Sequence, residues 1–309
     1  MSIDKNVISG FLSTTRPLRP LLKEAIALRK ERFGNTIKIH ILDNAKEGGC
    51  TEDCLYCGQS ARYNSHIESK SFLSTDTLIN HAKIAKSKGA YRFCMAIARR
   101  NALSEDIKSI GKVVRFANSK LGLKTCFSSG FLSKQDLIYL KGCGIDRINH
   151  NLNTSNTFYP KICTTHTYED RFNMARSIKA AGIGLCSGII IGMGESINDL
   201  VDLFFDLKRL NPDSIPVNFL VPIKGTPLEN TNYLTPKYCL RVLCALRILM
   251  PSTEIRVAAG REYHLGTLEP LSLLISDSTF LGNYLTTQGT EETKTIKVIK
   301  ALGLYPVNA

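Results

Sequence analysis

Three cysteines lie close together early in the chain, in the stretch GGCTEDCLYCGQSARY. Cys50, Cys54 and Cys57 form a C-x₃-C-x₂-C motif, and Tyr56 directly precedes the last cysteine. Three thiolates on one short loop suit an iron–sulfur cluster. A cubane cluster needs one ligand for each iron, so this motif leaves one iron open to an outside ligand. The alternative is a structural zinc site, but no second C-x₂-C pair follows, and His66 is poorly spaced for a fourth ligand.

Three further cysteines lie far apart in the sequence, each within a predicted strand. Cys94 lies in RFCM, Cys126 in KTCFSS and Cys186 in GLCSGIII. Each one alone is more simply explained as a small buried hydrophobic residue. Side chains alternate along a strand, however, so separate strands of one barrel can direct three thiols at one point. Beside a cluster motif, this pattern favours a second, shared metal site.

The elements that must position these residues repeat one unit, a helical pattern that ends at a Gly, Asn or Pro and is followed by a short apolar strand. Such alternation predicts a parallel sheet, and eight strands predict closure into a TIM-type (βα)₈ barrel, with an open doubly wound sheet as the alternative. We expect residues 1–35 to form an N-terminal helical extension with one leading helix at 20–33, residues 36–285 to form the barrel, and residues 286–309 to form a C-terminal segment that covers it, all within a single domain. The predicted strands are 37–42, 91–96, 123–127, 145–149, 183–191, 214–220, 254–258 and 279–282.

Composition limits the cellular context. The chain has 309 residues, ten cysteines and a net charge of +13. Its first residues do not resemble a secretory signal, and its apolar runs are too short to span a bilayer, so we expect a soluble cytoplasmic protein. Ten cysteines then favour metal or redox use over disulfides. Because Lys and Arg are dispersed along the chain, we expect a solvated basic surface and no nucleic-acid or membrane partner.

The cysteine motif after the first strand of a βα barrel resembles the signature of the radical S-adenosylmethionine (SAM) superfamily. The resemblance implies that Cys50, Cys54 and Cys57 hold a [4Fe–4S] cluster whose open iron chelates SAM. One electron then cleaves SAM to a 5′-deoxyadenosyl radical, which abstracts hydrogen from an unactivated C–H bond.

Within that superfamily, residues 40–305 resemble the biotin synthase family, a group of sulfurtransferases. The segments that carry the resemblance are, in order, RFCM, HNLNTS, TYEDR, CSGIIIGMGE, IPVNFLVPIKGTPL and IRVAAGRE. The resemblance implies conversion of dethiobiotin to biotin, the last step of biotin biosynthesis, with a [2Fe–2S] cluster as the sulfur source. It also implies that this cluster is held by Cys94, Cys126, Cys186 and Arg256, with Arg261 as the nearby alternative. From its chemistry alone Arg256 would be a charge partner and not a metal ligand, because a guanidinium has no lone pair to offer.

The same resemblance assigns residues around SAM and substrate. Arg171 would pair with the SAM carboxylate by bidentate hydrogen bonds. Asn153 stands where the family often has Asp for the ribose, and Asn151 would lie between SAM and dethiobiotin. The cofactor-binding set is Tyr56, Asn151, Asn153, Arg171, Gly188, Ile190 and Gly192, and the substrate set is Asn149, Asn151, Asn218, Thr286 and Thr287.

The resemblance further implies a homodimer and an electron donor such as flavodoxin or ferredoxin. Two alternatives remain open. One is another radical SAM enzyme of the hydrogenase-maturation or methylornithine-synthase type, which is not expected to combine Cys94, Cys126, Cys186 and Arg256. The other is a non-catalytic metal-binding protein. The remaining cysteines, Cys143, Cys163, Cys239 and Cys244, match no motif, and we expect them to be packing residues.

Overall fold

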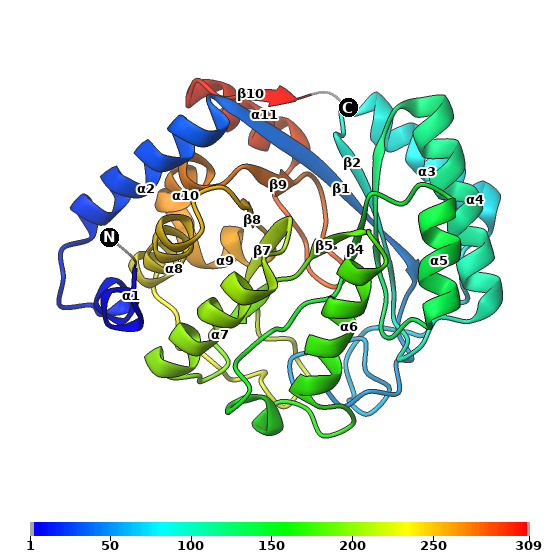
Figure 1. The fold of residues 1–309 in the computed structure, drawn as a ribbon, viewed down its shortest axis with the longest axis horizontal. Coiled ribbons are helices and arrows are strands. Elements are labelled where there is room, and N and C mark those ends of the chain that lie inside the picture. The colour runs from blue at the N-terminus through cyan, green and yellow to red at the C-terminus, as the bar shows by residue number, and fades with distance from the viewer. Residues whose placement is uncertain (1–2, 308–309) are drawn as a thin grey trace.

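A parallel β-barrel surrounded by helices forms the centre of the molecule (Figure 1). The structure is a computed structural model, and it describes residues 3–307. The sheet order is β1-β2-β3-β4-β5-β7-β8-β9, and β1 also pairs with β9, so the sheet closes on itself. This confirms the predicted TIM-type (βα)₈ barrel and excludes the open sheet. The strands of this path are β1 (Thr36–Lys46), β2 (Arg92–Ile97), β3 (Lys124–Ser128), β4 (Arg147–Asn149), β5 (Gly184–Cys186), β7 (Ser214–Phe219), β8 (Glu254–Val257) and β9 (Ser278–Phe280).

The predicted strand 183–191 is two strands in the structure, β5 and β6 (Ile189–Ile191). The break lies opposite Pro216 of β7, which has no N–H to continue the ladder. Gly188 sits in the break, and a Cβ atom there would lie 2.1 Å from the Pro216 carbonyl oxygen. The sequence pattern did not indicate this interruption, because all residues of the stretch are small or apolar.

Helices follow the strands and cover the outside of the barrel (Figure 1). Capping boxes fix several starts: Ser133 and Asp136 cap α5, and Thr167 and Asp170 cap α6. The helices that alternate with the strands are α3 (Thr75–Ser87), α4 (Ser104–Leu121), α5 (Lys134–Gly142), α6 (Tyr168–Ala180), α7 (Ile197–Leu210), α8 (Pro236–Leu249) and α10 (Glu269–Ile275), and the short helices are η1 (Tyr159–Lys161), α9 (Arg261–Leu265) and η2 (Gly266–Leu268).

The two ends of the chain add elements outside this repeat. The predicted leading helix is α2 (Leu18–Phe33), which packs on α8 and α10, and it is preceded by α1 (Lys5–Leu12), which the sequence analysis missed. At the other end, α11 (Glu292–Ala301) leads to β10 (Tyr305–Val307), which pairs with the start of β1. No helix among residues 3–307 is long and apolar enough to cross a membrane.

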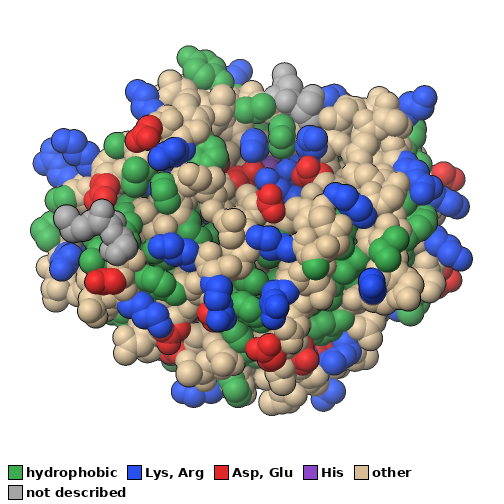
Figure 2. Space-filling model, viewed as in Figure 1, with side chains coloured by type: hydrophobic (Ala, Val, Ile, Leu, Met, Phe, Trp, Pro, Cys, Tyr) green, Lys and Arg blue, Asp and Glu red, His purple; other side chains and the backbone are tan. Residues whose placement is uncertain are grey.

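Basic side chains are scattered over the surface. In the face shown in Figure 2, Lys and Arg lie among Asp, Glu and apolar side chains without a large area of one sign. This agrees with the dispersed charge of the sequence.

Candidate functional site

The main cavity lies at the carboxyl ends of the strands, where barrel enzymes carry their chemistry. Its volume is about 340 Å³. The loop between β1 and α3 brings Cys50, Cys54 and Cys57 to its wall. The predicted residues that line it together are Cys50, Cys54, Tyr56, Cys57, Asn149, Asn151, Asn153, Arg171, Ile190, Asn218, Thr286 and Thr287.

Two predicted cofactor residues do not line this cavity. Gly188 lies behind it, and its N–H donates to Asn151 Oδ1 at 2.9 Å. The N–H of Gly192 donates to Glu195 Oε1 at 2.7 Å, and a Cβ atom at Gly192 would lie 2.7 Å from Leu234 side-chain atoms. Of the three residues assigned on this segment, only Ile190 faces the cavity.

The asparagines after β4 are joined to one another and to their surroundings. Asn149 donates through Nδ2 to Asn151 Oδ1 at 2.8 Å and contacts Cys186 Sγ at 3.3 Å. Asn153 has a φ of 69°, a left-handed conformation that Asn tolerates better than most residues. Its Nδ2 donates to the Tyr56 hydroxyl at 2.6 Å. The loop after β4 is thereby tied to the cysteine loop.

Arg171 lies in the first turn of α6, where the Thr167–Asp170 capping box fixes the start of the helix. Its Nη1 donates to the Asn151 carbonyl at 2.9 Å, and its Nε donates to the Tyr159 hydroxyl. Burial alone would lower the pKa of Arg171, but the surrounding Tyr159, Tyr56 and Cys54 raise it instead. The guanidinium therefore remains a cation on the cavity wall.

The second set of cysteines lies inside the barrel, next to the cavity. Cys94 and Cys126 are register partners on β2 and β3, and Cys186 stands beside Asn149 of β4. All three are buried and pack together with Ala258 and Phe280. The topology thus brings together three thiols that are distant in sequence: Cys126 follows Cys94 by 32 residues, and Cys186 follows Cys126 by 60 residues.

Arg256 of β8 completes this buried group. Its Nη2 donates to Cys186 Sγ at 2.9 Å and to Ser214 Oγ at 3.1 Å. Burial would lower the pKa of Arg256, but Cys186, Cys94 and Glu254 outweigh that effect and raise it. The alternative, Arg261, instead pairs with Glu262 and Glu269, so Arg256 is the arginine of the two that lies beside the thiols.

His40 was given no role by the sequence, yet it is fully buried beside Arg256. Its Nδ1 lies 2.9 Å from Arg256 Nη1 and 3.9 Å from Cys94 Sγ. Burial first, and then the charge of Arg256, hold the pKa of His40 well below its usual value. A neutral His40 can accept the hydrogen bond from Arg256 and fix the plane of the guanidinium.

Cys163 is buried in the core, as expected for a packing residue, and it also makes polar contacts. Its Sγ lies 3.8 Å from Cys54 Sγ and 3.3 Å from His166 Nδ1. The hydrogen bond from Cys54 is the main reason that the pKa of Cys163 falls to about 4, and the same contact raises the pKa of Cys54. His166 is only three residues further along, but Asp53 is 110 residues away, so the sequence gave no signal for the group as a whole.

The chemistry of the two thiol sets fits two iron–sulfur clusters. Cys50, Cys54 and Cys57 offer three thiols at a wall that stays open to the cavity. The second set offers three buried thiols and Arg256, whose Nε has no hydrogen-bond partner among residues 3–307. Membership of the radical SAM superfamily would account for the first set.

Comparison with known proteins identifies the family of this chain. A model described as the radical SAM superfamily matches residues 48–207, and one described as the biotin and thiamin synthesis associated domain matches residues 216–305. The chain is 44% identical to a biotin synthase of Leptospira biflexa over 94% of this chain and 82% of the relative. It is 42% identical to a biotin synthase of Halalkalibacterium halodurans over 92% of this chain and 85% of the relative.

Solved structures support the fold alone. A methylornithine synthase superposes with a TM-score of 0.84 at 19% identity, covering 100% of this chain and 95% of that one. The FeFe-hydrogenase maturase HydG from Carboxydothermus hydrogenoformans gives 0.84 at 14% identity, covering 99% of this chain and 76% of that one. Radical SAM membership implies a [4Fe–4S] cluster and SAM. On the strength of its curated relatives, this chain belongs to the biotin synthase family of the radical SAM superfamily.

Proposed function

We propose that this protein is a biotin synthase that inserts sulfur into dethiobiotin by radical SAM chemistry. The observation that supports this most is the second thiol set, which is buried directly beside the cavity and linked to it by Asn149. A sulfur-inserting enzyme needs a sulfur source within reach of the substrate carbons. The other radical SAM reactions considered above have no use for Cys94, Cys126, Cys186 and Arg256 together.

The first cluster would be held by Cys50, Cys54 and Cys57, and when bound it supplies the electron that cleaves SAM. The chain's own residues then orient SAM. Arg171 offers a cation for the SAM carboxylate, and Asn153, steadied by Tyr56, offers an amide for the ribose hydroxyls. Ile190 would pack on the adenine, with Gly188 and Gly192 behind it.

The second cluster would be held by Cys94, Cys126, Cys186 and Arg256, and it is best described as a substrate, because one of its sulfides is consumed. Arg256 already donates to Cys186 and to His40, so its guanidinium is fixed before any cluster binds. Lys38 and Arg147 neutralise Glu254 at 3.0 and 3.1 Å and keep that carboxylate from competing for Arg256.

Dethiobiotin would occupy the space between the two thiol sets. Asn149, Asn151 and Asn218 offer the donors and acceptors that a ureido ring requires. Thr286 and Thr287 lie on the cavity wall near the C-terminal end and would meet the substrate carboxylate. The apolar share of the wall, which includes Leu42, Phe280 and Leu285, suits the alkyl chain.

The remaining assignments follow from the family. We propose that the protein acts in the cytoplasm as a homodimer and receives electrons from flavodoxin or ferredoxin. We also propose the division into an N-terminal extension (1–35), a barrel (36–285) and a C-terminal segment (286–309).

An anaerobic assay tests the function. The protein is reconstituted with iron and sulfide, then incubated with dethiobiotin, SAM and a reductant, and the products are identified by mass spectrometry. Inserting one sulfur between two carbons breaks two C–H bonds, so we expect two molecules of 5′-deoxyadenosine for each molecule of biotin. Formation of 5′-deoxyadenosine without biotin would contradict the assignment of dethiobiotin as the substrate and would support radical SAM chemistry alone.

A further inference from the structure

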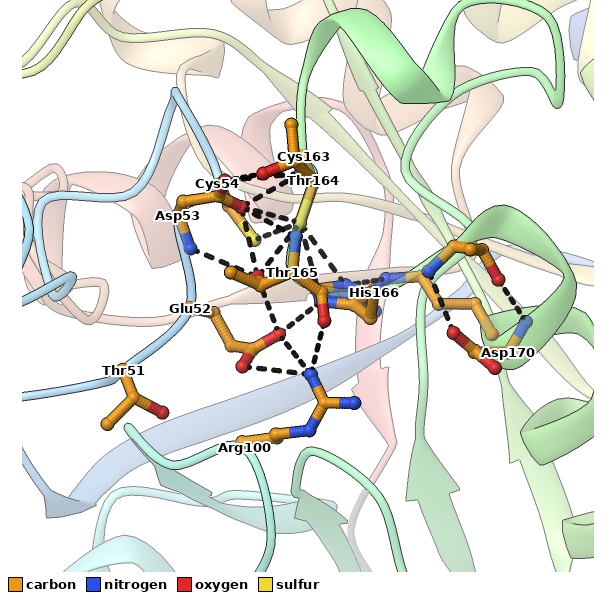
Figure 3. A network of polar contacts seen from close by, with 12 residues as sticks. Thr51, Glu52, Asp53, Cys54, Arg100, Cys163, Thr164, Thr165, His166 and Asp170 are labelled. Carbon is orange, nitrogen blue, oxygen red and sulfur yellow. Dashed lines mark hydrogen bonds and ion pairs between the residues drawn. The ribbon is translucent and has the colours of Figure 1, made fainter.

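Cys54, Cys163 and His166 form a compact buried group that the reaction proposed above does not use as a unit. Their ligand atoms all lie within 4.8 Å of one another. Cys54 comes from the loop after β1, whereas Cys163 and His166 lie on the segment between η1 and α6 (Figure 3). Figure 3 shows these two segments facing each other, with the side chains of Glu52, Asp53 and Cys163 turned inward.

The spacing of these atoms suits one tetrahedral metal ion. Zinc–sulfur and zinc–nitrogen bonds of about 2.3 and 2.0 Å separate neighbouring ligand atoms in a tetrahedron by roughly 3.5–3.8 Å. The observed separations are 3.8 Å between the two sulfurs and 3.3 Å between Cys163 Sγ and His166 Nδ1. Small side-chain adjustments would therefore let one ion touch all three.

An outer shell of polar partners is also present. Asp53 Oδ1 lies 3.1 Å from Cys163 Sγ and is held by the backbone N–H of Thr164 at 2.9 Å. Metal binding at His166 Nδ1 puts the ring proton on Nε2, where the Tyr159 hydroxyl lies 2.8 Å away and can accept it. Arg171 Nε donates to Nε2 at 3.0 Å in the metal-free structure, and it would lose that hydrogen bond on metal binding. Arg171 donates to the same hydroxyl.

The local charge accommodates a dication. The two thiolates formed on binding would neutralise its charge. The carboxylates that border the group, Glu52 and Asp53, are offset by Arg100, which pairs with Glu52 at 3.1 Å, and by Arg171, which lies 3.0 Å from His166. Glu52 also contacts His166 Nδ1, and it would give up that contact when a metal takes its place. Binding would release the protons of the coordinating thiols to solvent, as usual for thiolate sites.

We propose that the cluster-free protein binds one zinc-type divalent cation through Cys54, Cys163 and His166, with solvent in the fourth position. Since Cys54 is also a proposed ligand of the [4Fe–4S] cluster, the cation and that cluster exclude each other. The chain thereby has two metal states, and a borderline-soft cation such as Zn²⁺ competes with loading of the first cluster.

Cobalt titration of the cluster-free protein under anaerobic conditions tests the site directly. We expect one Co²⁺ per chain, with the visible bands of tetrahedral cobalt and a sulfur-to-cobalt charge-transfer band. Cys163→Ser and His166→Ala should each weaken cobalt binding by roughly tenfold or more, because even outer-shell partners of a metal are worth about 10–100-fold.

Cys50→Ser and Cys57→Ser are the matched controls, because they remove cysteines of the cluster motif but leave the proposed ligands intact. They should bind cobalt with unchanged affinity. The opposite pattern, with cobalt lost in Cys50→Ser and Cys57→Ser but kept in Cys163→Ser and His166→Ala, would place the ion on the motif alone and overturn the proposal. Circular dichroism verifies that each variant is folded.

A second measurement tests the competition, which rests on the cluster ligands proposed above. Zinc added before iron and sulfide should slow the appearance of cluster absorption several-fold in the wild type and much less in Cys163→Ser. Equal slowing in both proteins would contradict the competition. If Cys163→Ser makes biotin but the wild type binds no cobalt, only this inference fails; if cobalt binds but no biotin forms, only the proposed function fails.

Discussion

The two thiol sets are built in different ways. Cys50, Cys54 and Cys57 lie within eight residues on one loop, counted from 50 to 57, whereas Cys94, Cys126 and Cys186 come from three strands of the barrel. Local sequence spacing determines the first set, and strand register determines the second. The first can therefore be recognised from a short motif, but the second emerges only when the barrel closes.

The supports of the two sets differ as well. The loop of the first set is held by side-chain contacts, because Asp53 accepts hydrogen bonds from Thr164 and Thr165, and Glu52 contacts Arg100 and His166. The second set is held by backbone ladders and by buried charge around Glu254. An accessible loop suits a cluster that must exchange ligands with SAM, and a rigid interior suits a cluster that must be kept from solvent.

The largest expected effect comes from the first set. Cys54→Ala should abolish SAM cleavage, so that neither 5′-deoxyadenosine nor biotin is detected by mass spectrometry. The reason is that a cubane with only two protein thiolates has no stable position on this loop. Cys244→Ala, a buried cysteine of α8 outside both sets, is the control and should retain both products. Deoxyadenosine at the wild-type level in Cys54→Ala would remove this loop from the cluster.

A change in the second set should separate the two products. Cys126→Ala is expected to keep some SAM cleavage and make no biotin, because the first cluster stays intact while the sulfur source is lost. Both products are measured in the same reaction. An equal biotin yield in Cys126→Ala and in the wild type would contradict the assignment of the sulfur donor.

Removal of His40 should have a smaller effect on the same set. In His40→Ala the buried Nη1 of Arg256 loses its acceptor, which costs about 1–3 kcal/mol. We expect occupancy of the second cluster to fall roughly tenfold at limiting iron, which corresponds to a loss of about 1.4 kcal/mol of binding free energy. Visible absorption of the cluster measures the occupancy. His40→Asn, which can still accept a hydrogen bond, should recover part of it. Unchanged occupancy in His40→Ala would show that Arg256 needs no such support.

The smallest effect concerns the support of the loop. Burial would raise the pKa of Asp53, but hydrogen bonds from Thr164, Cys163 and Thr165 lower it far more. A lowered pKa in the folded state means that these contacts stabilise the protein above the unfolded pKa of about 3.9, and that the stabilisation is lost as the pH falls below it.

Asp53→Asn should therefore lower the free energy of unfolding at pH 7, and the difference from wild type should shrink as the pH falls from 5 towards 3. Urea unfolding of the cluster-free wild type and variant, at pH 7 and at lower pH, measures these free energies of unfolding. Asp202→Asn, an exposed carboxylate paired with Lys5 on the surface, is the control and should change little. A difference that is the same at pH 7 and pH 3 would mean that the Asp53 carboxylate does not hold the loop.

Most of the barrel could be predicted from the sequence, because most helices end close to a Gly, Asn or Pro and most strands carry apolar residues. The features missed depend on distant partners. The break between β5 and β6 is caused by Pro216 on a neighbouring strand, and β10 forms only because the start of β1 is free to pair. Helix α1 was missed because its apolar residues pack on α7 and α8, far along the chain.

The same limit applies to the site. The thiols of both sets and Arg256 were found through motifs and family resemblance, and the structure brings the second group together. His40 and Cys163 carry no local signal, since a buried histidine or cysteine in an apolar segment is most often a packing residue. Arg256 lies 216 residues from His40, and Cys54 lies 109 residues from Cys163, so only the tertiary structure reveals these contacts.

The break at Gly188 also bears on engineering of this enzyme. A saturation library at position 188 should return glycine alone, because any side chain would collide with the Pro216 carbonyl oxygen at 2.1 Å. At Gly142 of α5, by contrast, a Cβ atom would meet nothing within 4 Å, and that position should accept many residues. Efforts to broaden the substrate range are therefore better directed at Asn218 and Thr287, which line the cavity, than at Gly188.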